Sequence, residues 1–382
     1  MKKPFTPFPK IWLSPPHLSG SEITFVEEAL DGNWVSPAGP HLDSFEQDLA
    51  IYLNIPHAVA LASGTAALHL ALAILGIKRG DFVCCQSLTF VASANPILYQ
   101  GGIPVFVDSE TESWNICPDA LEAAFKKYAR RGKIPKAVIV VHLFGMPANL
   151  GALLPLCQHY GVALIEDAAE ALGSIYFGQS LGTAGDMGII SFNGNKIITT
   201  SAGGALLTKD KFNAEKARFL STQAKEESPY YQHREVGYNY RMSNICAGIG
   251  RSQLLVLSER VRARRAIFHF YQTHLASFTE ISFQPEASAS RSNRWLTALL
   301  LDPVLGKKNW PEQIRARMEG QGIETRRVWK PMHLQPLFRD APYIGGTVSQ
   351  GLFERGLCLP SGSALTEDQL LRIVDELRLV LS

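Results

Sequence analysis

The chain has 382 residues, more than one compact hydrophobic core usually holds, so we expect two domains. Hydrophobic residues make up 46% and charged residues 19%, a balance that is typical of globular proteins and excludes a disordered chain. The net charge is only +2 and no basic block is present, which argues against a nucleic-acid-binding protein.

No stretch of the sequence indicates export or a membrane span. The first five residues carry two lysines but no apolar segment follows them, so we expect no signal peptide. The most apolar stretch, 58–75, is interrupted by polar residues at 63–65 and contains His69, which predicts a strand and a helix. The six cysteines lack Cys-x-x-Cys spacing, and we expect them to be reduced in a cytoplasmic protein.

From residue 58 onward, short apolar runs alternate with longer amphipathic ones. The apolar runs predict strands at Ala58–Ala62, Phe82–Cys85, Pro104–Val107, Ala137–Val141, Val162–Ile165, Met187–Phe192 and Gly204–Leu207. The amphipathic runs predict helices at Thr65–Leu75, Val91–Tyr99, Asp119–Tyr128 and Leu150–Tyr160. Apolar strands that alternate with helices predict an α/β fold, in which a mainly parallel sheet is flanked by helices on both faces.

The last third of the chain has a different pattern. Leu254–Leu275 predicts one long, arginine-rich helix, and a helix of that length often links two domains. Beyond it, strand and helix segments at Thr297–Leu301, Pro311–Glu319 and Thr366–Leu379 predict a smaller α+β domain. We therefore expect a large domain with the N-terminal segment at 1–253 and a small C-terminal domain at 254–382.

An aspartate and a lysine each follow an apolar run. Asp167 comes directly after Val162–Ile165 and Glu166, and Lys196 follows Met187–Phe192. Ligands of parallel sheets bind at the carboxyl ends of the strands. A lysine that bonds to an aldehyde and a carboxylate that keeps a pyridine nitrogen protonated are what pyridoxal phosphate requires. Taken singly, a solvated loop lysine and a helix-start carboxylate without a ligand remain alternatives.

Ser63-Gly64-Thr65 stands between a predicted strand and a predicted helix. Backbone N–H groups at a helix start are unpaired and carry partial positive charge, so they suit a phosphate. Gly64 permits close approach of the backbone, and Thr65 adds a hydroxyl group. An ordinary helix N-cap is the alternative interpretation. Phe90 begins a helix after a strand, where it would stack on a cofactor ring or else pack in the core.

Other cofactor motifs are absent from the sequence. It contains no Gly-x-Gly-x-x-Gly, no Gly-Lys-Ser/Thr phosphate loop and no His-Glu-x-x-His. The ten histidines show no metal-ligand spacing, so we expect no metal site.

Five motifs in a fixed order resemble those of one family. They are Ala-Ser-Gly-Thr at 62–65, Leu-Thr-Phe at 88–90, Glu-Asp-Ala-Ala at 166–169, Ser-Phe-Asn-Gly-Asn-Lys at 191–196 and Gly-Tyr-Asn-Tyr-Arg-Met-Ser at 237–243. Together they resemble the pyridoxal-phosphate-dependent nucleotide-sugar aminotransferases of the DegT/DnrJ/StrS type, over nearly the whole chain. The resemblance implies a fold-type I aminotransferase that works as a homodimer with active sites at the subunit interface.

The resemblance also implies roles for single residues. Lys196 would carry the covalent bond to the cofactor, and Asp167 would pair with its pyridine nitrogen. The remaining cofactor contacts would be Gly64, Thr65 and Ser191 at the phosphate, Phe90 over the ring, Asn239 reaching the phosphate from the neighbouring subunit, and Glu170. Relatives often have His or Gln at the position of Glu170, which contacts the ring.

Within the family, the Gly-Asn-Lys variant at 194–196 and the segment 324–333 resemble enzymes that make UDP-N-acetylbacillosamine precursors. These enzymes aminate a UDP-2-acetamido-4-keto-2,4,6-trideoxyhexose with L-glutamate, which leaves as 2-oxoglutarate. Sugar dehydratases of the same fold carry histidine in place of Lys196, so the lysine favours amine transfer. The expected substrate contacts are Trp34, Ser36, Trp329 and His333.

Alternatives remain for both the function and the substrate contacts. The enzyme would otherwise act on another nucleotide 4-keto-6-deoxy sugar, or as a pyridoxal-phosphate-dependent sugar dehydratase. A non-catalytic protein that retains the fold is a third possibility. The turn-rich segment 34–40 would otherwise be a plain surface loop, and His333 a core histidine with satisfied hydrogen bonds.

Overall fold

A central sheet of eight strands organises the protein, whose computed structural model describes residues 9–302 and 309–381. Its strands are, in spatial order, β1 (His57–Leu61), β9 (Gly204–Thr208), β8 (Met187–Ser191), β5 (Ala163–Asp167), β4 (Ala137–Val141), β2 (Phe82–Gln86), β3 (Ile103–Val107) and β14 (Tyr343–Ile344). From β8 to β14 neighbouring strands are parallel, whereas β9 is antiparallel to both neighbours. All seven predicted strands are present with ends within two residues of the prediction, and the predicted fold class is confirmed.

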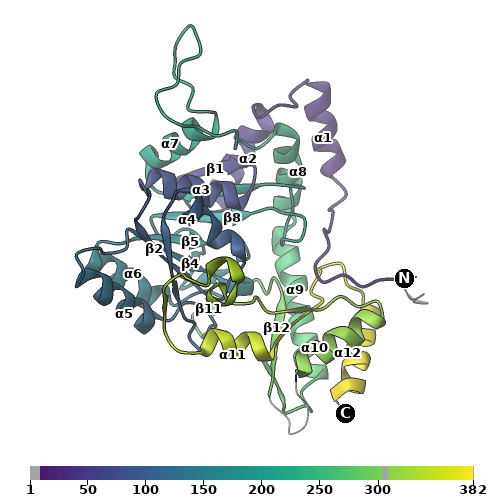
Figure 1. Cartoon of the computed structure of the whole chain (residues 1–382). Coiled ribbons are helices and arrows are strands. Elements are labelled where there is room, and N and C mark those ends of the chain that lie inside the picture. The colour runs from purple at the N-terminus through teal and green to yellow at the C-terminus, as the bar shows by residue number, and fades with distance from the viewer. Residues whose placement is uncertain (1–8, 303–308, 382) are drawn as a thin grey trace.

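Helices cover both faces of this sheet (Figure 1). Alternate residues of a strand point to opposite faces, so Val138 and Val140 of β4 pack in one core cluster and Ile139 in the other. One cluster includes residues of α5 (Pro118–Ala129) and α6 (Leu150–Tyr160). The other includes residues of α3 (Gly64–Ile74) and α7 (Lys211–Ser221). This two-sided burial explains why the strands are apolar throughout.

The helix predicted at Val91–Tyr99 is wrong as a single element. The chain forms a 3₁₀ turn, η1 (Val91–Ser93), and then a short helix, α4 (Asn95–Tyr99). Pro96 lacks a backbone N–H, so it cannot continue a helix from residue 92 but fits the first turn of a new one.

The long helix predicted at Leu254–Leu275 is also wrong at its start. The chain instead forms α8 (Asn244–Leu255) and α9 (Leu257–His274), because Val256 leaves helical geometry at φ −102° and ψ 4°. Helix α8 packs against α1 (Glu22–Asp31) and α2 (Pro40–Leu53), which the sequence analysis did not predict. Figure 1 shows α1 and α8 side by side, with α9 continuing toward the C-terminal part.

The C-terminal part contains a four-stranded antiparallel sheet. Its strands are, in order, β10 (Ile281–Phe283), β12 (Thr297–Leu301), β15 (Gly356–Leu359) and β13 (Arg326–Arg327). The helices α10 (Trp310–Gly320), α11 (Val348–Arg355) and α12 (Glu367–Leu381) accompany it. A third core cluster joins this sheet to α9, α10 and α12. The strand predicted at 297–301 and the helices predicted near 311–319 and 366–379 are confirmed.

The two parts of the chain are joined by more than α9. Strand β14 lies beyond the predicted domain boundary at 253/254, yet it pairs with β3 in the large sheet. A small sheet joins β11 (Ser290–Arg291) to β6 (Ile175–Tyr176), which pairs with β7 (Gln179–Ser180). The predicted boundary remains a proposal, and these pairings hold the C-terminal part close to the ends of the central strands.

The described residues contain no helix that is long and apolar enough to cross a membrane. All six cysteines are free; Cys84, Cys85, Cys157 and Cys358 are buried.

Candidate active site

A cavity of about 200 Å³ lies at the carboxyl ends of the central strands. It brings together seven of the residues predicted to bind cofactor and one of those predicted to bind substrate. These residues are Gly64, Thr65, Phe90, Asp167, Glu170, Ser191, Lys196 and Trp329. The parallel topology accounts for this convergence, because β5 and β8 end on the same side of the sheet.

The amine of Lys196 is held between an acidic group and an aromatic ring. Its side chain is only 13% exposed, and Nζ lies 3.8 Å from Oε1 of Glu170. Nζ also lies 4.2 Å from the centre of the Trp295 ring, where the negative face of the ring attracts a cation. Lys196 is part of a turn, since its N–H donates to the carbonyl of Asn193. Lys196 therefore lines the cavity and is not a solvated loop residue.

Asp167 is a buried carboxylate whose charge lacks a cationic partner. Oδ2 accepts a 2.7 Å hydrogen bond from the Ser93 hydroxyl, and Oδ1 accepts one of 3.2 Å from the Ala169 N–H. Among the described residues, no cation lies within ion-pair distance, although only 8% of Asp167 is exposed. Burying an uncompensated charge is costly. A protonated pyridine nitrogen supplies the missing cation, so the residue fits pyridoxal phosphate.

Ser93 is a site residue that the sequence analysis missed. It follows β2 in the 3₁₀ turn η1, and its hydroxyl also contacts the Thr89 hydroxyl at 2.8 Å. The hydrogen bond to Asp167 spans 74 residues of sequence. The only local signal for this role is that Ser93 lies three residues after Phe90, in the turn that follows the buried strand β2.

The start of α3 forms a compact anion site. Ser63 caps the helix, accepting a 3.0 Å hydrogen bond from the Ala66 N–H, so the first amides at Gly64 and Thr65 lack partners within the helix. A Cβ atom on Gly64 would lie 3.1 Å from Cβ of Ser191, tighter than ordinary contact. Phosphate oxygens suit these amides and the positive end of the helix.

Glu170 faces the lysine from the loop after β5. Its Oε2 accepts a 2.7 Å hydrogen bond from the N–H of Phe144, whose backbone has a positive φ of 55°. Burial raises the pKa of the Glu170 carboxyl and Asp167 adds to this, while Lys196 and the Phe144 amide oppose it. The nearby indole N–H of Trp329 also lowers the pKa of this carboxyl. Glu170 is thus a buried acid beside the reactive amine.

Glu166, the neighbour of Asp167, has a structural environment. Its carboxylate accepts hydrogen bonds from the N–H groups of residues 182, 184 and 185 and lies 2.9 Å from Nε2 of His142. Nδ1 of His142 accepts from the Ala148 N–H, which assigns the ring proton to Nε2. Burial by itself would raise the pKa of Glu166, but His142 and the amides lower it overall. Glu166 does not line the cavity.

Four aromatic side chains line up beside the cavity. Phe90 is half-exposed, and its ring centre lies 5.3 Å from that of Trp329. Trp329 stacks on Phe144 at 6.2 Å, and Phe144 stacks on Trp295 at 6.5 Å. Trp295, which precedes β12 in the C-terminal part, was not predicted because nothing in its local sequence points to the site. The row gives the cavity an apolar wall.

Three of the four predicted substrate contacts lie outside this cavity. Trp34 and Ser36 are exposed between α1 and α2, where their carbonyls accept hydrogen bonds of 2.9 Å from Asn244. His333 contacts the Ser87 hydroxyl at 2.7 Å through Nδ1, and its ring stacks on a tyrosine. Burial lowers the pKa of His333. Substrate contact by these residues stays a prediction, and His333 has the contacts of a core histidine.

Asn239 also lies outside the cavity of its own chain. It is exposed, and its backbone bridges to Thr222 in the connection between α7 and α8. Figure 1 shows that this connection extends away from the body of the molecule. Contact between Asn239 and a neighbouring subunit therefore stays a prediction.

A largely buried lysine, a buried carboxylate that has no cation among the described residues, and a helix N-terminus meet in one cavity, and together they define a pyridoxal-phosphate-dependent enzyme. The chain matches the DegT/DnrJ/EryC1/StrS aminotransferase family model over residues 16–378. It belongs to this family and is a sugar aminotransferase that uses pyridoxal phosphate.

Individual relatives agree with this assignment. The chain is 52% identical to EpsN of Bacillus subtilis (strain 168), over 96% of this chain and 95% of the relative. It is 36% identical to the GDP-perosamine synthase of Caulobacter vibrioides, over 98% and 99% of the two chains. The PLP-form structure of Spr1654 from Streptococcus pneumoniae superimposes with a TM-score of 0.89 at 25% identity, covering 97% of this chain and 98% of that one.

The geometry at Gly64 gives a first prediction. In Gly64→Ala, the added Cβ crowds Ser191, which lines the same cavity. Crowding of this kind costs about 1–3 kcal/mol, which corresponds to about a 5- to 150-fold rise in the Kd for pyridoxal phosphate. Fluorescence titration of the apoprotein measures this constant.

Gly351→Ala is the matched control. Gly351 lies in α11, and a Cβ there meets no atom within 4 Å. The control should leave the Kd unchanged and slightly stabilise the helix. Equal affinity for both variants would contradict the assignment of the α3 amides to the phosphate.

Proposed function

We propose that the enzyme transfers the amino group of L-glutamate to C4 of a UDP-2-acetamido-4-keto-2,4,6-trideoxyhexose. The observation that carries the proposal is the amine of Lys196 in one cavity with the Asp167 carboxylate and the start of α3. An amine at this position favours amino transfer, because dehydratases of the same fold resemble this chain but carry histidine there.

Each side chain of the cavity has a distinct role in the proposed reaction. Bound pyridoxal phosphate supplies an electron sink that stabilises negative charge at the reacting carbon. Asp167 holds the proton on the pyridine nitrogen. The free amine of Lys196 moves a proton between Cα of the donor and C4′ of the cofactor, acting as base and then acid. Glu170, 3.8 Å away, holds this amine inside the cavity.

A second cavity supports a nucleotide-linked substrate. It measures about 820 Å³ and shares Asn195, Trp295 and Trp329 with the first. Its cationic side chains are Arg315, Arg326, Arg327 and Lys330. Two carboxylates there pair with arginines, whereas Lys330 has no ion pair among the described residues. A diphosphate fits this excess of positive charge, with the sugar directed at Lys196.

A GDP-linked 4-keto-6-deoxy sugar is the second candidate substrate. GDP-perosamine synthases of three bacteria are 34–36% identical to this chain over at least 94% of its length. The spore coat polysaccharide biosynthesis protein SpsC of Bacillus subtilis is 31% identical over 95% of the chain. These relatives support a role in polysaccharide biosynthesis.

We further propose a cytoplasmic homodimer with shared active sites. Asn239 lies on the extended α7–α8 connection, outside the cavity of its own chain. Tyr230, Tyr231 and Val236 on the same connection are each more than two-thirds exposed. An apolar, extended segment of this kind suits contact with a second subunit, into whose cavity Asn239 would reach.

Lys196→Ala should abolish the visible absorbance of bound cofactor and lower turnover by about 10⁴-fold or more, because covalent attachment and proton transfer are both lost. Absorbance spectra and product analysis measure the two effects. Lys126→Ala removes only a surface ion pair with Glu122 and should change neither. Retention of absorbance or turnover in Lys196→Ala would refute the assignment.

A panel of nucleotide 4-keto sugars tests the substrate. With glutamate present, we expect a 4-amino sugar from the UDP-linked 2-acetamido substrate, with a kcat/KM about tenfold or more above that of GDP-linked sugars. Product mass and 2-oxoglutarate release measure the reaction. Preference for a GDP sugar would favour the second candidate, and a deoxy product without an amine would indicate a dehydratase.

Mixing two inactive variants tests the shared site. In a random mixture of Lys196→Ala and Asn239→Ala subunits, half of the dimers are hybrids with one intact site. About a quarter of wild-type activity should therefore return. Activity no greater than that of the parent variants would argue against a site built from two subunits.

A further inference from the structure

The peptide carbonyl just before Lys196 is held by two donors from outside the central sheet. The carbonyl oxygen of Asn195 accepts a 2.8 Å hydrogen bond from Nε1 of Trp295 and a 2.7 Å bond from the Ser14 hydroxyl. Ser14 belongs to the N-terminal segment, and Trp295 precedes β12 in the C-terminal part. The backbone of the lysine turn is thus fixed by two segments far away in sequence.

One guanidinium group orients both of these donors. Arg264 of α9 donates from Nη2 to the Ser14 hydroxyl at 3.0 Å and from Nη1 to the carbonyl of Trp295. It also donates to the carbonyl of Ser361 at 3.1 Å. The planar fork of an arginine can hold several acceptors in a fixed geometry, which the single nitrogen of a lysine cannot do. Arg264 therefore links the two supports of the Asn195 carbonyl.

Burial of the charged Arg264 side chain is energetically unfavourable. The side chain is 1% exposed, and no carboxylate lies within ion-pair distance among the described residues. Burial, together with the nearby Arg260, lowers the pKa of the guanidinium to about 9. Its Nε atom is buried without an acceptor. A buried charge without an ion pair is a costly way to stabilise a fold, so the hydrogen bonds that Arg264 donates indicate a role besides stability.

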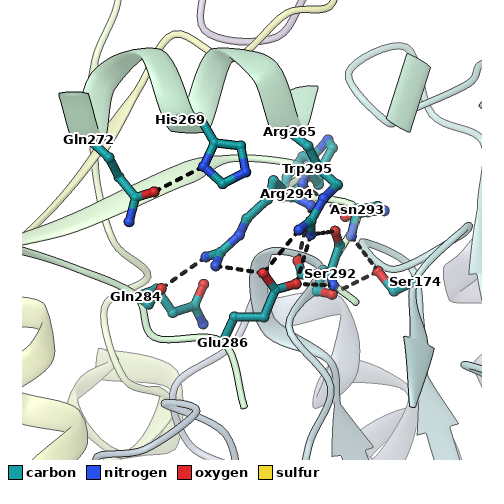
Figure 2. A network of polar contacts seen from close by, with 11 residues as sticks. Ser174, Arg265, His269, Gln272, Gln284, Glu286, Ser292, Asn293, Arg294 and Trp295 are labelled. Atoms are coloured by element: carbon teal, nitrogen blue, oxygen red, sulfur yellow. Dashed lines mark hydrogen bonds and ion pairs between the residues drawn. The ribbon is translucent and has the colours of Figure 1, made fainter. Parts of the chain in front are cut away.

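Trp295 connects the hydrogen bonds of Arg264 to the surroundings of the Lys196 amine. Its ring lies 4.2 Å from Nζ of Lys196, and its backbone N–H donates to Oδ1 of Asn293 at 2.8 Å. Nδ2 of Asn293 donates to the carbonyl of Glu170 at 3.0 Å. Figure 2 shows Asn293 and Trp295 beside the Arg265–Glu286–Arg294 network of the C-terminal part. Both groups that flank the amine are therefore fixed by this one segment.

We propose that Arg264 is a positioning residue for Lys196. Through Ser14 and Trp295 it fixes the Asn195 carbonyl, and thereby the direction from which the lysine amine meets the cofactor aldehyde. The inference rests on the proposed role of Lys196 but not on the identity of the sugar. It also couples the C-terminal part of the chain to the reactive residue at the end of β8.

The test measures the rate at which the apoprotein forms its covalent bond with pyridoxal phosphate. Misplacement of a reacting group by about 1 Å costs about 100-fold in rate, so we expect Arg264→Met to slow bond formation about 10- to 100-fold. Its thermal midpoint should fall, because the buried carbonyls of Trp295 and Ser361 lose their donor. Arg264→Lys keeps the charge without the fork and should still slow the reaction.

Tyr271→Phe is the matched control for a structural role. Tyr271 is a fully buried residue of the same helix, and its hydroxyl donates at 2.8 Å to the carbonyl of Pro360, next to Ser361. The control should lower the thermal midpoint and leave the rate of bond formation unchanged. Slower bond formation in Tyr271→Phe, in proportion to its lost stability, would overturn the proposal.

A double-variant background isolates the path through the two donors. In Ser14→Ala/Trp295→Phe both hydrogen bonds to the Asn195 carbonyl are absent, and bond formation should be slow. Adding Arg264→Lys should then cause no further loss, because coupled residues act non-additively. The proposal is overturned if Arg264→Lys reacts at the wild-type rate, or slows both backgrounds by the same factor. This assay uses only apoprotein and cofactor. Its outcome therefore does not depend on whether the panel of nucleotide sugars identifies a substrate.

Discussion

The uncompensated carboxylate of Asp167 sets the charge balance of the whole site. It is buried at the end of β5 with two hydrogen bonds and no cation within ion-pair distance in the described part of the chain, so it requires a positive partner in the cavity. Glu166, one residue earlier, faces the other side of the strand and is satisfied by His142 and three amides. The alternation of a strand thus separates a structural carboxylate from a functional one.

The rest of the cavity meets requirements that the same cofactor imposes. The open amides of α3 suit its phosphate, and Gly64 leaves room for close approach. The amine of Lys196 lies opposite, held between Glu170 and Trp295. Glu170 lies beside the amine, and burial raises the pKa of its carboxyl. Glu170 and Trp295 both flank the amine of Lys196, the group that we assign to proton transfer.

The C-terminal part contributes more than a cover for the cavity. Trp295 and Trp329 separate the small cavity from the larger basic one, and the segment around Asn293 ties the loop after β5 to α9. Residues near the cofactor and residues proposed for the nucleotide therefore share a wall. In the proposed reaction the larger cavity would select the nucleotide sugar, and Asp167 and Lys196 would act on the cofactor.

The sequence by itself determined the strands and the residues at their ends. Runs such as Ala137–Val141 are apolar throughout because both faces of the sheet are buried, and parallel strands bring Asp167 and Ser191 to the same edge. Only the tertiary structure revealed Ser93, Trp295 and Arg264, and only it placed His333 outside the cavity. Their partners are distant along the chain: 100 residues separate Trp295 from Asn195. Local periodicity reports which face of an element is buried, whereas hydrogen bonds between distant segments depend on how whole elements pack.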